Sequence, residues 1–361
     1  MKENYFNSSK QKNMKTLIII TLSFAMSIGA MAQTYITQVK PYGEKLWGYA
    51  NQNGEITIAA KYKKCYKYAE NGLAPIYESK QFLFINTKGE EMTTEITGFK
   101  MIEGFIGIGG LQGYNEGMVA VVKNKKWGFL NSQGEVAIEL KYDKVSIFNS
   151  GFAIAKSGDA FFVVNKSGEE IEISGAEFID IKQFSDGLAP FTNSAKQFGY
   201  IDDKGKVAIQ ADFLTVGYFN DGLAWAKGSD KKVGYINKKG EWVIEPKFDA
   251  AKNFDPTSGL ARIKTEGKWA YTNKNGEILT VDTETWGDFS EGLARGKKGG
   301  KTGYYNNKGE WTIAPEYDGG RDFKNGFAAV KKGDKWGFIN QSGEWVIEAQ
   351  FAAVKDLERV D

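Results

Sequence analysis

The sequence predicts an all-β protein made of a tandem array of short repeats. One nine-residue pattern recurs nine times along the 361 residues, and internal repetition at a fixed period is typical of repeat architectures. The apolar segments within each copy are four to six residues long, which suits strands and is too short for helices. The composition is 42% hydrophobic and 14% aromatic, which excludes a wholly disordered chain.

The pattern is seen most completely as WGFLNSQGE at Trp127 and WGFINQSGE at Trp336. A turn glycine marks each of the nine copies: Gly54, Gly89, Gly134, Gly168, Gly205, Gly240, Gly276, Gly309 and Gly343. Successive turn glycines are 33 to 37 residues apart, except for one interval of 45. The longer interval contains a Gly-rich insertion at 98–113.

Each unit holds three short strands. A segment such as DGLA at Gly187 or Gly222 precedes the pattern, and a segment such as EWVIEPKFD follows its turn. Asn stands first in eight of the nine turns and Asp202 in the other, with Gly three positions later. Because Asn or Asp can bond the backbone ahead of it and Gly accepts a left-handed conformation, these turns predict hairpins. The unit is then a three-stranded antiparallel meander of about 35 residues, followed by an irregular or single-turn helical linker.

Alternation along the strands assigns the faces. In Trp-Gly-Phe-Ile the Trp and Phe share one face, while the Gly lets a neighbouring backbone or ring pack closely. A 35-residue unit cannot enclose a core alone, so stacking against its neighbours must complete it. We expect nine meanders in an open superhelical, solenoid-like array, with the polar C-terminal KDLERVD capping the last unit. The alternative is a closed ring like a β-propeller.

These residues resemble the WG repeat, also called the KWG repeat, of bacterial exported proteins. Its carriers are the Trp-Gly dipeptides at Trp47, Trp127 and Trp336, together with the N-x-x-G-E turn and the D/E-G-L-A strand. The chain departs from the pattern at Val233 and Thr302 in the Trp position, and at Leu83, Phe162 and Ala270 in the Gly position. The resemblance implies an exported β-repeat array and transfers no catalytic residue. The repeat residues assigned a structural role are Trp47, Trp127, Trp269, Trp336, Gly54, Gly134, Gly205, Gly240, Gly309 and Gly343.

The N-terminal segment 1–32 predicts a signal peptide. Lys15 precedes an apolar run from Leu17 to Ile28, and Ala30-Met31-Ala32 suits cleavage before Gln33. Met14 is an alternative translation start, and a retained N-terminal anchor is the alternative to cleavage. The array then occupies 33–361 without a transmembrane segment, and we expect export to the periplasm, the cell surface or the medium.

Composition excludes many kinds of chemistry. With no histidine and one cysteine, Cys65, the chain lacks the residues for His-based catalysis, for Cys/His metal sites and for a disulfide framework. The net charge of +2 gives no electrostatic basis for binding nucleic acid. Asp202-Asp203 and Glu90-Glu91 lie at hairpin turns and predict solvated charges. We therefore expect neither a cofactor nor a metal, nor an enzyme, although two distant carboxylates of a carbohydrate-active enzyme would leave no sequence signature.

Positions that differ between the units are the candidates for binding. The third residue after the glycine of the GLA segment is Trp225, Arg262 and Arg295 in three consecutive units, and Trp286 lies in the linker between the last two. Trp and Arg are favoured in binding hot spots, whereas Arg stems also pack over apolar surface without any ligand. The prediction is a noncatalytic exported binding or scaffold protein for a protein or cell-envelope component. The alternative is a glycan-binding module, and the sequence leaves the oligomeric state open.

Overall fold

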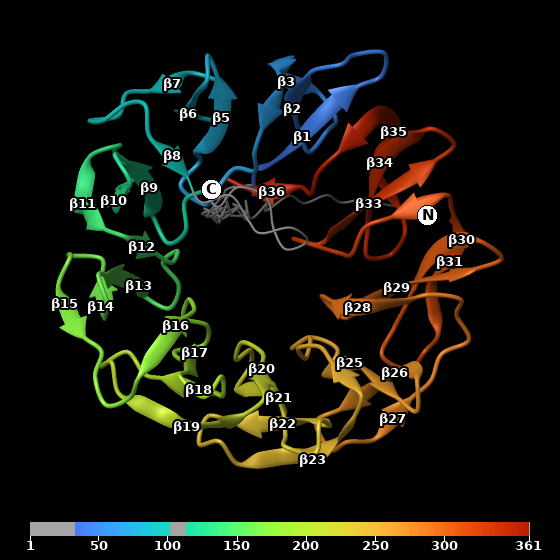
Figure 1. The fold of residues 1–361 in the computed structure, drawn as a ribbon. Helices are drawn as coiled ribbons and strands as arrows, with labels where there is room; N and C mark the ends of the chain where they lie inside the picture. The colour runs from blue at the N-terminus through green and yellow to red at the C-terminus, as the bar shows by residue number, and fades with distance from the viewer. Residues whose placement is uncertain (1–32, 102–112, 361) are drawn as a thin grey trace, which may run out of the picture. The chain divides into compact units, whose positions relative to one another are not determined.

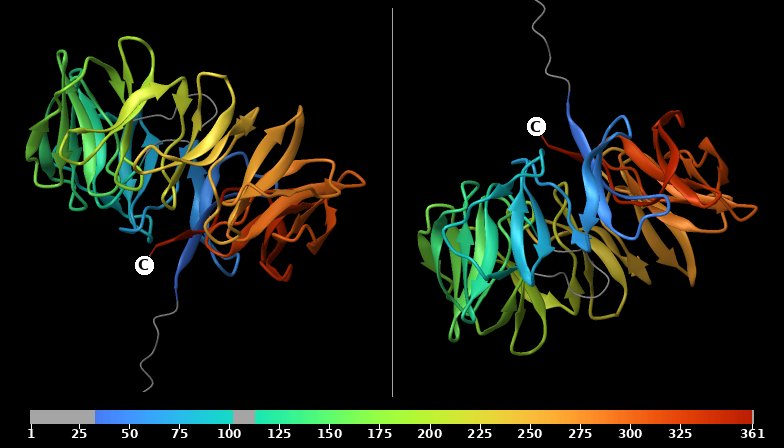
Figure 2. Two further views of the ribbon diagram at one scale, coloured as in Figure 1. Left: turned by 90° about the horizontal axis from the view of Figure 1, so that it is seen from below. Right: turned by 90° about the horizontal axis from the view of Figure 1, so that it is seen from above.

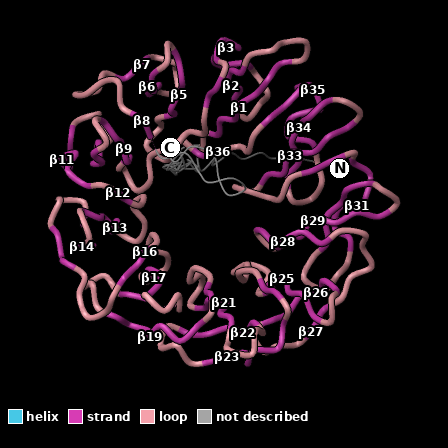
Figure 3. The backbone as a smooth tube through the Cα atoms, viewed as in Figure 1, coloured by secondary structure: helices cyan, strands magenta, loops and turns pink. Residues whose placement is uncertain are grey.

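The computed structural model describes residues 33–101 and 113–360, all of which belong to one compact unit, Gln33–Asp361. The predicted signal peptide and most of the Gly-rich insertion lie outside the described residues. The described chain consists of strands, turns and loops, with no helix among these residues (Figure 3). Accordingly, none of them forms a helix long and apolar enough to span a membrane.

Among the described residues, thirty-six strands form eight antiparallel sheets, seven with four strands and one with eight. The eight-stranded sheet contains both the first and the last unit, so we divide it in two and call the nine units blades 1 to 9 in chain order. The first strands of blades 2 to 9 are β4 (Lys64–Cys65), β8 (Lys100–Met101), β12 (Lys144–Val145), β16 (Phe178–Ile181), β20 (Thr215–Val216), β24 (Ala250–Ala251), β28 (Trp286–Ser290) and β32 (Gly319–Gly320). The second strands of blades 1 to 9 are β1 (Tyr35–Pro41), β5 (Ala74–Glu78), β9 (Val119–Lys123), β13 (Phe152–Ser157), β17 (Ala189–Asn193), β21 (Leu223–Lys227), β25 (Leu260–Thr265), β29 (Leu293–Lys298) and β33 (Phe327–Lys332).

The third strands are β2 (Trp47–Asn51), β6 (Gln81–Ile85), β10 (Lys126–Leu130), β14 (Ala160–Asn165), β18 (Phe198–Ile201), β22 (Val233–Asn237), β26 (Lys268–Asn273), β30 (Lys301–Tyr305) and β34 (Lys335–Asn340). The fourth strands are β3 (Ile56–Tyr62), β7 (Glu91–Met92), β11 (Val136–Tyr142), β15 (Glu170–Glu172), β19 (Val207–Phe213), β23 (Trp242–Phe248), β27 (Ile278–Leu279), β31 (Trp311–Tyr317) and β35 (Trp345–Val354). The first strand of each blade lies toward the centre and the fourth toward the outside (Figure 1). The last strand of the chain, β36 (Glu358–Arg359), pairs with β1.

The all-β repeat with nine units is confirmed, but the prediction of three strands per unit is wrong. The linker that was expected to be irregular or helical supplies the additional strand, which is the first strand of blades 2 to 9 and has two residues in six of these eight blades. It pairs with the strand of the GLA segment, as where the backbone N–H of Lys252 donates to the carbonyl of Arg262 at 2.9 Å. The linker joins the sheet because it forms hydrogen bonds with backbone N–H and C=O groups of the GLA strand that would otherwise be unpaired.

The Asn turns are formed as the sequence predicts. In the turn at Asn237, the side-chain Oδ1 accepts the N–H groups of Lys239 and Glu241 at 2.9 and 3.1 Å. Its Nδ2 donates to the Glu241 carboxylate at 2.8 Å, and Gly240 adopts a φ of +82°. A Glu follows the turn glycine in eight of the nine units, and its carboxylate accepts from the turn Asn in each of them. In the ninth turn, which begins with Asp202, Lys206 follows the glycine.

The glycine of the Trp-Gly dipeptide is needed because the fourth strand passes directly over it. A Cβ at Gly234 would lie 2.3 Å from the carbonyl oxygen of Ile244. The other five glycines at this position would clash with the matching Ile carbonyl at 2.3 to 2.6 Å: Gly48, Gly128, Gly199, Gly303 and Gly337. In these six blades the fourth strand has seven residues or more. In the three blades with Leu83, Phe162 and Ala270 at this position, it has two or three.

Nine hydrophobic clusters fill the nine junctions between neighbouring blades. Each draws buried side chains from two consecutive blades, for example Tyr235 and Ile244 of blade 6 with Ala261 and Ile263 of blade 7. The ninth cluster joins Val39 of blade 1 to blade 9. Linear stacking of nine units would leave only eight junctions, so the blades close into a ring.

The expected open array is therefore wrong, and the closed alternative holds. Strand β1 pairs with the end of β35, where Val39 faces Val354, and with β36, where Ile36 faces Glu358. Figure 2 shows the C-terminal residues running beside the N-terminal strands. The chain end is not a polar cap, because Val354 and Leu357 are 3% and 1% exposed. Residues 352–360, which we call the closing segment, supply the missing first strand of blade 1.

Candidate functional site

A chain of hydrogen bonds links the blades along the turns that precede the GLA segments. The residue before the glycine accepts the N–H of the equivalent glycine in the next blade: Glu116 from Gly151 at 2.9 Å and Asp186 from Gly222 at 2.8 Å. Both oxygens of Glu291 are used, by the N–H groups of Asn325 and Gly326 at 2.6 and 2.8 Å. The acidic residue of the D/E-G-L-A pattern therefore ties one blade to the next.

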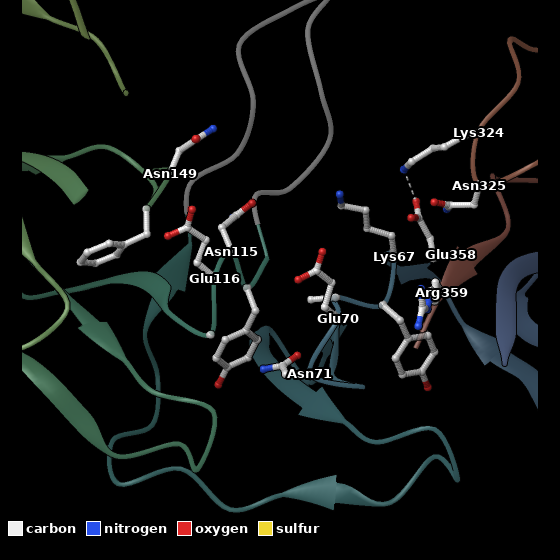
Figure 4. A pocket seen from close by; sticks show the side chains of 15 residues that line it. Lys67, Glu70, Asn71, Asn115, Glu116, Asn149, Lys324, Asn325, Glu358 and Arg359 are labelled. Atoms are coloured by element: carbon white, nitrogen blue, oxygen red, sulfur yellow. Dashed lines mark hydrogen bonds and ion pairs between the residues drawn. The ribbon is translucent and has the colours of Figure 1, made fainter. Parts of the chain in front are cut away.

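One cavity lies at blade 2, where the residue before the glycine is no longer acidic. There the residue before the glycine is Asn71, whose amide donates to the hydroxyl of Ser132 at 3.2 Å. The space has a volume of about 650 Å³, and we call it the turn cavity (Figure 4). Its charged and amide lining residues are Lys67, Glu70, Asn71, Asn115, Glu116, Asn149, Lys324, Asn325, Glu358 and Arg359.

Two opposite charges in the turn cavity are not used by the fold. Lys324 pairs with Glu358 at 2.6 Å, and Glu116 pairs with Lys166 at 3.3 Å. The side chains of Lys67 and Glu70 have no hydrogen-bond or ion-pair partner among the described residues. Figure 4 shows both side chains at the cavity. They can bind charges that a ligand brings.

The second cavity, of about 540 Å³, lies between blades 6, 7 and 8. Its lining includes Trp225, the exposed ring of Tyr218, Asn253 and Asp288. We call it the Trp225 cavity. The backbone N–H of Gly217, on the facing inner segment, donates to the Trp225 carbonyl at 2.8 Å.

The structure brings Arg262 and Trp286 together at one junction. Arg262 Nη1 donates to the carbonyl of Trp286, its Nε lies 2.8 Å from Asp288 Oδ1, and its guanidinium lies 4.6 Å from the centre of the Trp269 ring. The contact with Asp288 is an ion pair that is not aligned as a hydrogen bond. The Trp286 indole packs on Tyr271, with ring centres 5.2 Å apart. Neither side chain lines the Trp225 cavity, and both are engaged by these contacts within the fold.

Arg295 repeats this arrangement one blade further on. Its Nη1 donates to the carbonyl of Gly320, and its Nε lies 3.1 Å from Asp322. Arg295 does not line either cavity. Of the four residues predicted for binding, Trp225 lines one of these two cavities, and the three others make hydrogen bonds, ion pairs or ring contacts within the fold.

The Trp residues of the repeat lie outside both cavities. Trp47, Trp127, Trp269 and Trp336 are half-buried in their third strands. Trp127 faces Tyr142 of the fourth strand, and Trp336 faces Phe351 in the same register. These rings cover the hairpin of their own blade and contribute to the fold.

Burial changes the acidity of several groups without creating a reactive site. Burial raises the pKa of the Cys65 thiol to about 12, and Tyr49 lies beside it. Burial likewise raises the pKa of Tyr305 to about 12. A protonated thiol is a poor nucleophile, so Cys65 is a packing residue. No group of His, Cys, Asp and Glu among the described residues is arranged to hold a metal ion.

Sequence reasoning missed the turn cavity and the closing segment. Lys67 and Glu70 lie in a linker whose residues carry no repeated signature. The closing segment does carry a signal, because Leu357 continues the linker series Phe254, Phe289 and Phe323 at the same spacing of 34 or 35 residues. Its sequence, FAAVKDL, is similar to FDAAKNF of the linker after blade 6.

Comparison with protein families matches the WG containing repeat at residues 47–78, 127–159, 198–231, 234–269, 303–336 and 336–358, just over half of the chain. The chain belongs to the WG-repeat family. The six matched WG repeats are the six units that carry the dipeptide glycine beneath a long fourth strand. No matched repeat begins in the third strand of the three units with a short fourth strand.

Comparison with solved structures finds chains similar to this WG-repeat protein at low sequence identity, and the first one named below shares its fold. A crystal structure of the eukaryotic initiation factor has a TM-score of 0.53 at 10% identity, covering 90% of this chain and 98% of that chain. BamB from Moraxella catarrhalis has a TM-score of 0.39 at 10% identity, covering 87% and 90%. The WD40 beta propeller domain of Doa1 has a TM-score of 0.29 at 9% identity, covering 60% and 81%. No curated protein matches the sequence.

Proposed function

We propose that this WG-repeat protein is a noncatalytic, exported binding or scaffold protein that holds a protein partner of the cell envelope. The observation that carries the proposal is that the two cavities are lined in part by residues that the other units do not repeat. Repeated residues form turns, junction clusters and blade-to-blade bonds, and some of them, such as Glu116 and Phe254, also line the cavities. Residues that the other units do not repeat, such as Lys67 and Trp225, line the cavities beside them. A rigid ring that presents unit-specific side chains is suited to binding.

The chemistry of the turn cavity favours a polypeptide segment as its occupant. Four asparagine side chains line it, and each uses only part of its donor and acceptor capacity within the fold. An amide can pair with both the N–H and the C=O of a peptide backbone. The free charges of Lys67 and Glu70 suit a partner segment that carries both an acidic and a basic side chain.

Two of the three carboxylates that line the turn cavity support a noncatalytic role. Glu116 accepts the N–H of Gly151, and Glu358 pairs with Lys324. A general acid or base needs a proton to exchange with substrate, and these groups are already committed to structural bonds. Hydrolysis of a glycan or peptide by the purified protein, abolished by one carboxylate substitution, would overturn this part of the proposal.

Capture from the native envelope tests the partner. The chain from Gln33 onward is used as bait, together with a variant that exchanges the two free charges, Lys67→Glu with Glu70→Lys. The same protein should be captured by the wild type and lost with the variant. A control that exchanges two exposed charges elsewhere, Lys239→Glu with Glu245→Lys, should capture it unchanged. Equal capture by all three proteins would refute the assignment of the turn cavity.

Export has its own test. Expression of the full chain in its native host, followed by fractionation and N-terminal sequencing, should give a mature protein that begins at Gln33 outside the cytoplasm. A cytoplasmic protein that keeps residues 1–32 would refute export.

A further inference from the structure

No other GLA segment has a Trp at the position of Trp225. The equivalent residues of the other seven GLA segments are Pro75, Ala120, Ile154, Pro190, Arg262, Arg295 and Ala329. The facing residue, Gly217, has no side chain, and a Cβ there would lie 2.3 Å from the indole Nε1. The missing side chain is what allows the indole to lie across the inner strand. The ring is half-buried and lines the cavity.

The cavity around this indole combines apolar rings with planar polar groups. Tyr218, with 36% of its surface exposed, and Pro256 extend the apolar surface. Asn220, Asn253 and Asp288 contribute amide and carboxylate groups to the lining. An apolar platform bordered by a few polar groups is the usual composition of a small-ligand site.

Most of the polar groups are held in place by the fold. Asn220 Nδ2 donates to the carbonyl of Phe254 at 2.9 Å, which leaves its oxygen free to accept. The Arg262 guanidinium lies 2.8 Å from one oxygen of Asp288 and balances its charge. The Asn253 side chain is exposed and has no hydrogen-bond partner among the described residues. The cavity thus offers oriented acceptors and one unused amide, with little net charge from the Arg–Asp pair.

We propose that the Trp225 cavity is a carbohydrate subsite. A sugar ring has one face of C–H groups that packs on an indole, and an edge of hydroxyl groups that both donate and accept hydrogen bonds. Trp225 supplies the platform, and Asn220, Asn253 and Asp288 bond the hydroxyl edge. This inference goes beyond the proposed protein-binding role, because it concerns a different cavity on different blades.

Intrinsic fluorescence and saturation-transfer NMR test the subsite. The probes are hexasaccharides of cellulose, chitin, mannan and laminarin, offered separately to the chain from Gln33 onward. At least one hexasaccharide should shift the Trp emission saturably and show transfer to its ring protons. Trp225→Ala and Asn253→Ala should each weaken that binding by about tenfold or more, at a melting temperature like that of the wild type.

Matched variants keep the test decisive. Trp127→Phe removes a Trp far from the cavity and should leave affinity unchanged, as should Lys67→Glu in the turn cavity. If Trp225→Ala fails to fold, Asn253→Ala and Trp225→Phe decide the outcome, because neither removes the ring from the junction. The absence of binding by all four hexasaccharides, or equal binding by Asn253→Ala and the wild type, overturns the subsite. Neither result affects capture of a protein through Lys67 and Glu70.

Discussion

Closure of the ring by the closing segment makes a quantitative prediction for Leu357. This side chain is 1% exposed and packs with Val39, Phe351 and Val354 in the ninth junction. Replacing a buried Leu by Ala costs about 2 to 5 kcal/mol, since it removes apolar burial and leaves a cavity. At about 2.1 cal/mol/K of unfolding entropy per residue, that loss lowers the Tm of a chain this long by about 3 to 7 °C.

The assay is a thermal melt of Leu357→Ala beside a control with the same chemistry. Leu214 is 42% exposed, so Leu214→Ala should change stability by no more than about 0.5 kcal/mol. Truncation after Phe351 should lower the Tm further than Leu357→Ala, because it also leaves the inner edge of β1 unpaired. If Leu357→Ala and the truncated chain both melt together with Leu214→Ala, the closing segment does not stabilise blade 1 and the reasoning is refuted.

Three further predictions concern the repeat and its buried groups. Gly337→Ala should lower the free energy of unfolding, measured in urea, by about 1 to 3 kcal/mol or more, because the new Cβ would lie 2.3 Å from a carbonyl oxygen. Ala270→Gly, in a blade with a short fourth strand, should lower it by only about 0.5 to 1 kcal/mol. Equal losses of stability would contradict the role of the fourth strand. Asn237→Ala should lower the free energy of unfolding by about 1 kcal/mol, and Asn237→Asp by less, since Asp202 makes the same backbone bonds in the equivalent turn. Equal stability of the two variants in urea would show that the side-chain oxygen does not stabilise the turn. Burial raises the pKa of Tyr305 to about 12, from about 10 in the unfolded chain. The protonated ring therefore stabilises the fold fully below about pH 10, and this contribution is lost as the pH rises through 12. Tyrosinate absorbance should rise together with loss of the near-ultraviolet circular dichroism signal, and ionisation before unfolding would show that the ring is accessible to solvent.

The strands and turns were predictable because their causes are local. The Asn237 side chain bonds the backbone two and four residues ahead, and any sequence with that spacing can form the turn. The clash that requires Gly234 is also within one hairpin, because the Ile244 carbonyl is ten residues further along the chain. The residues that make these interactions belong to the repeated pattern, so each copy of the pattern predicts them.

The closure and the sites were not predictable in the same way. Closure joins Val39 to Val354 across nearly the whole chain, and a two-residue strand leaves little periodicity to detect. Arg262 looked like a hot-spot residue, yet its charge is balanced by Asp288 in the next linker, a contact fixed only once blades 7 and 8 meet. Trp225 could be singled out because it breaks the repeat at a position where its neighbours are known.

The pairing of β1 with the closing segment has a consequence for biosynthesis. The residues that complete blade 1 follow blade 9 in the sequence, so the first sheet waits with an open edge until all nine blades have been synthesised. Open edges invite pairing with other chains, and a truncated product would carry this liability permanently. Loss of the final ten residues should therefore produce intermolecular aggregates more readily than loss of any internal surface turn.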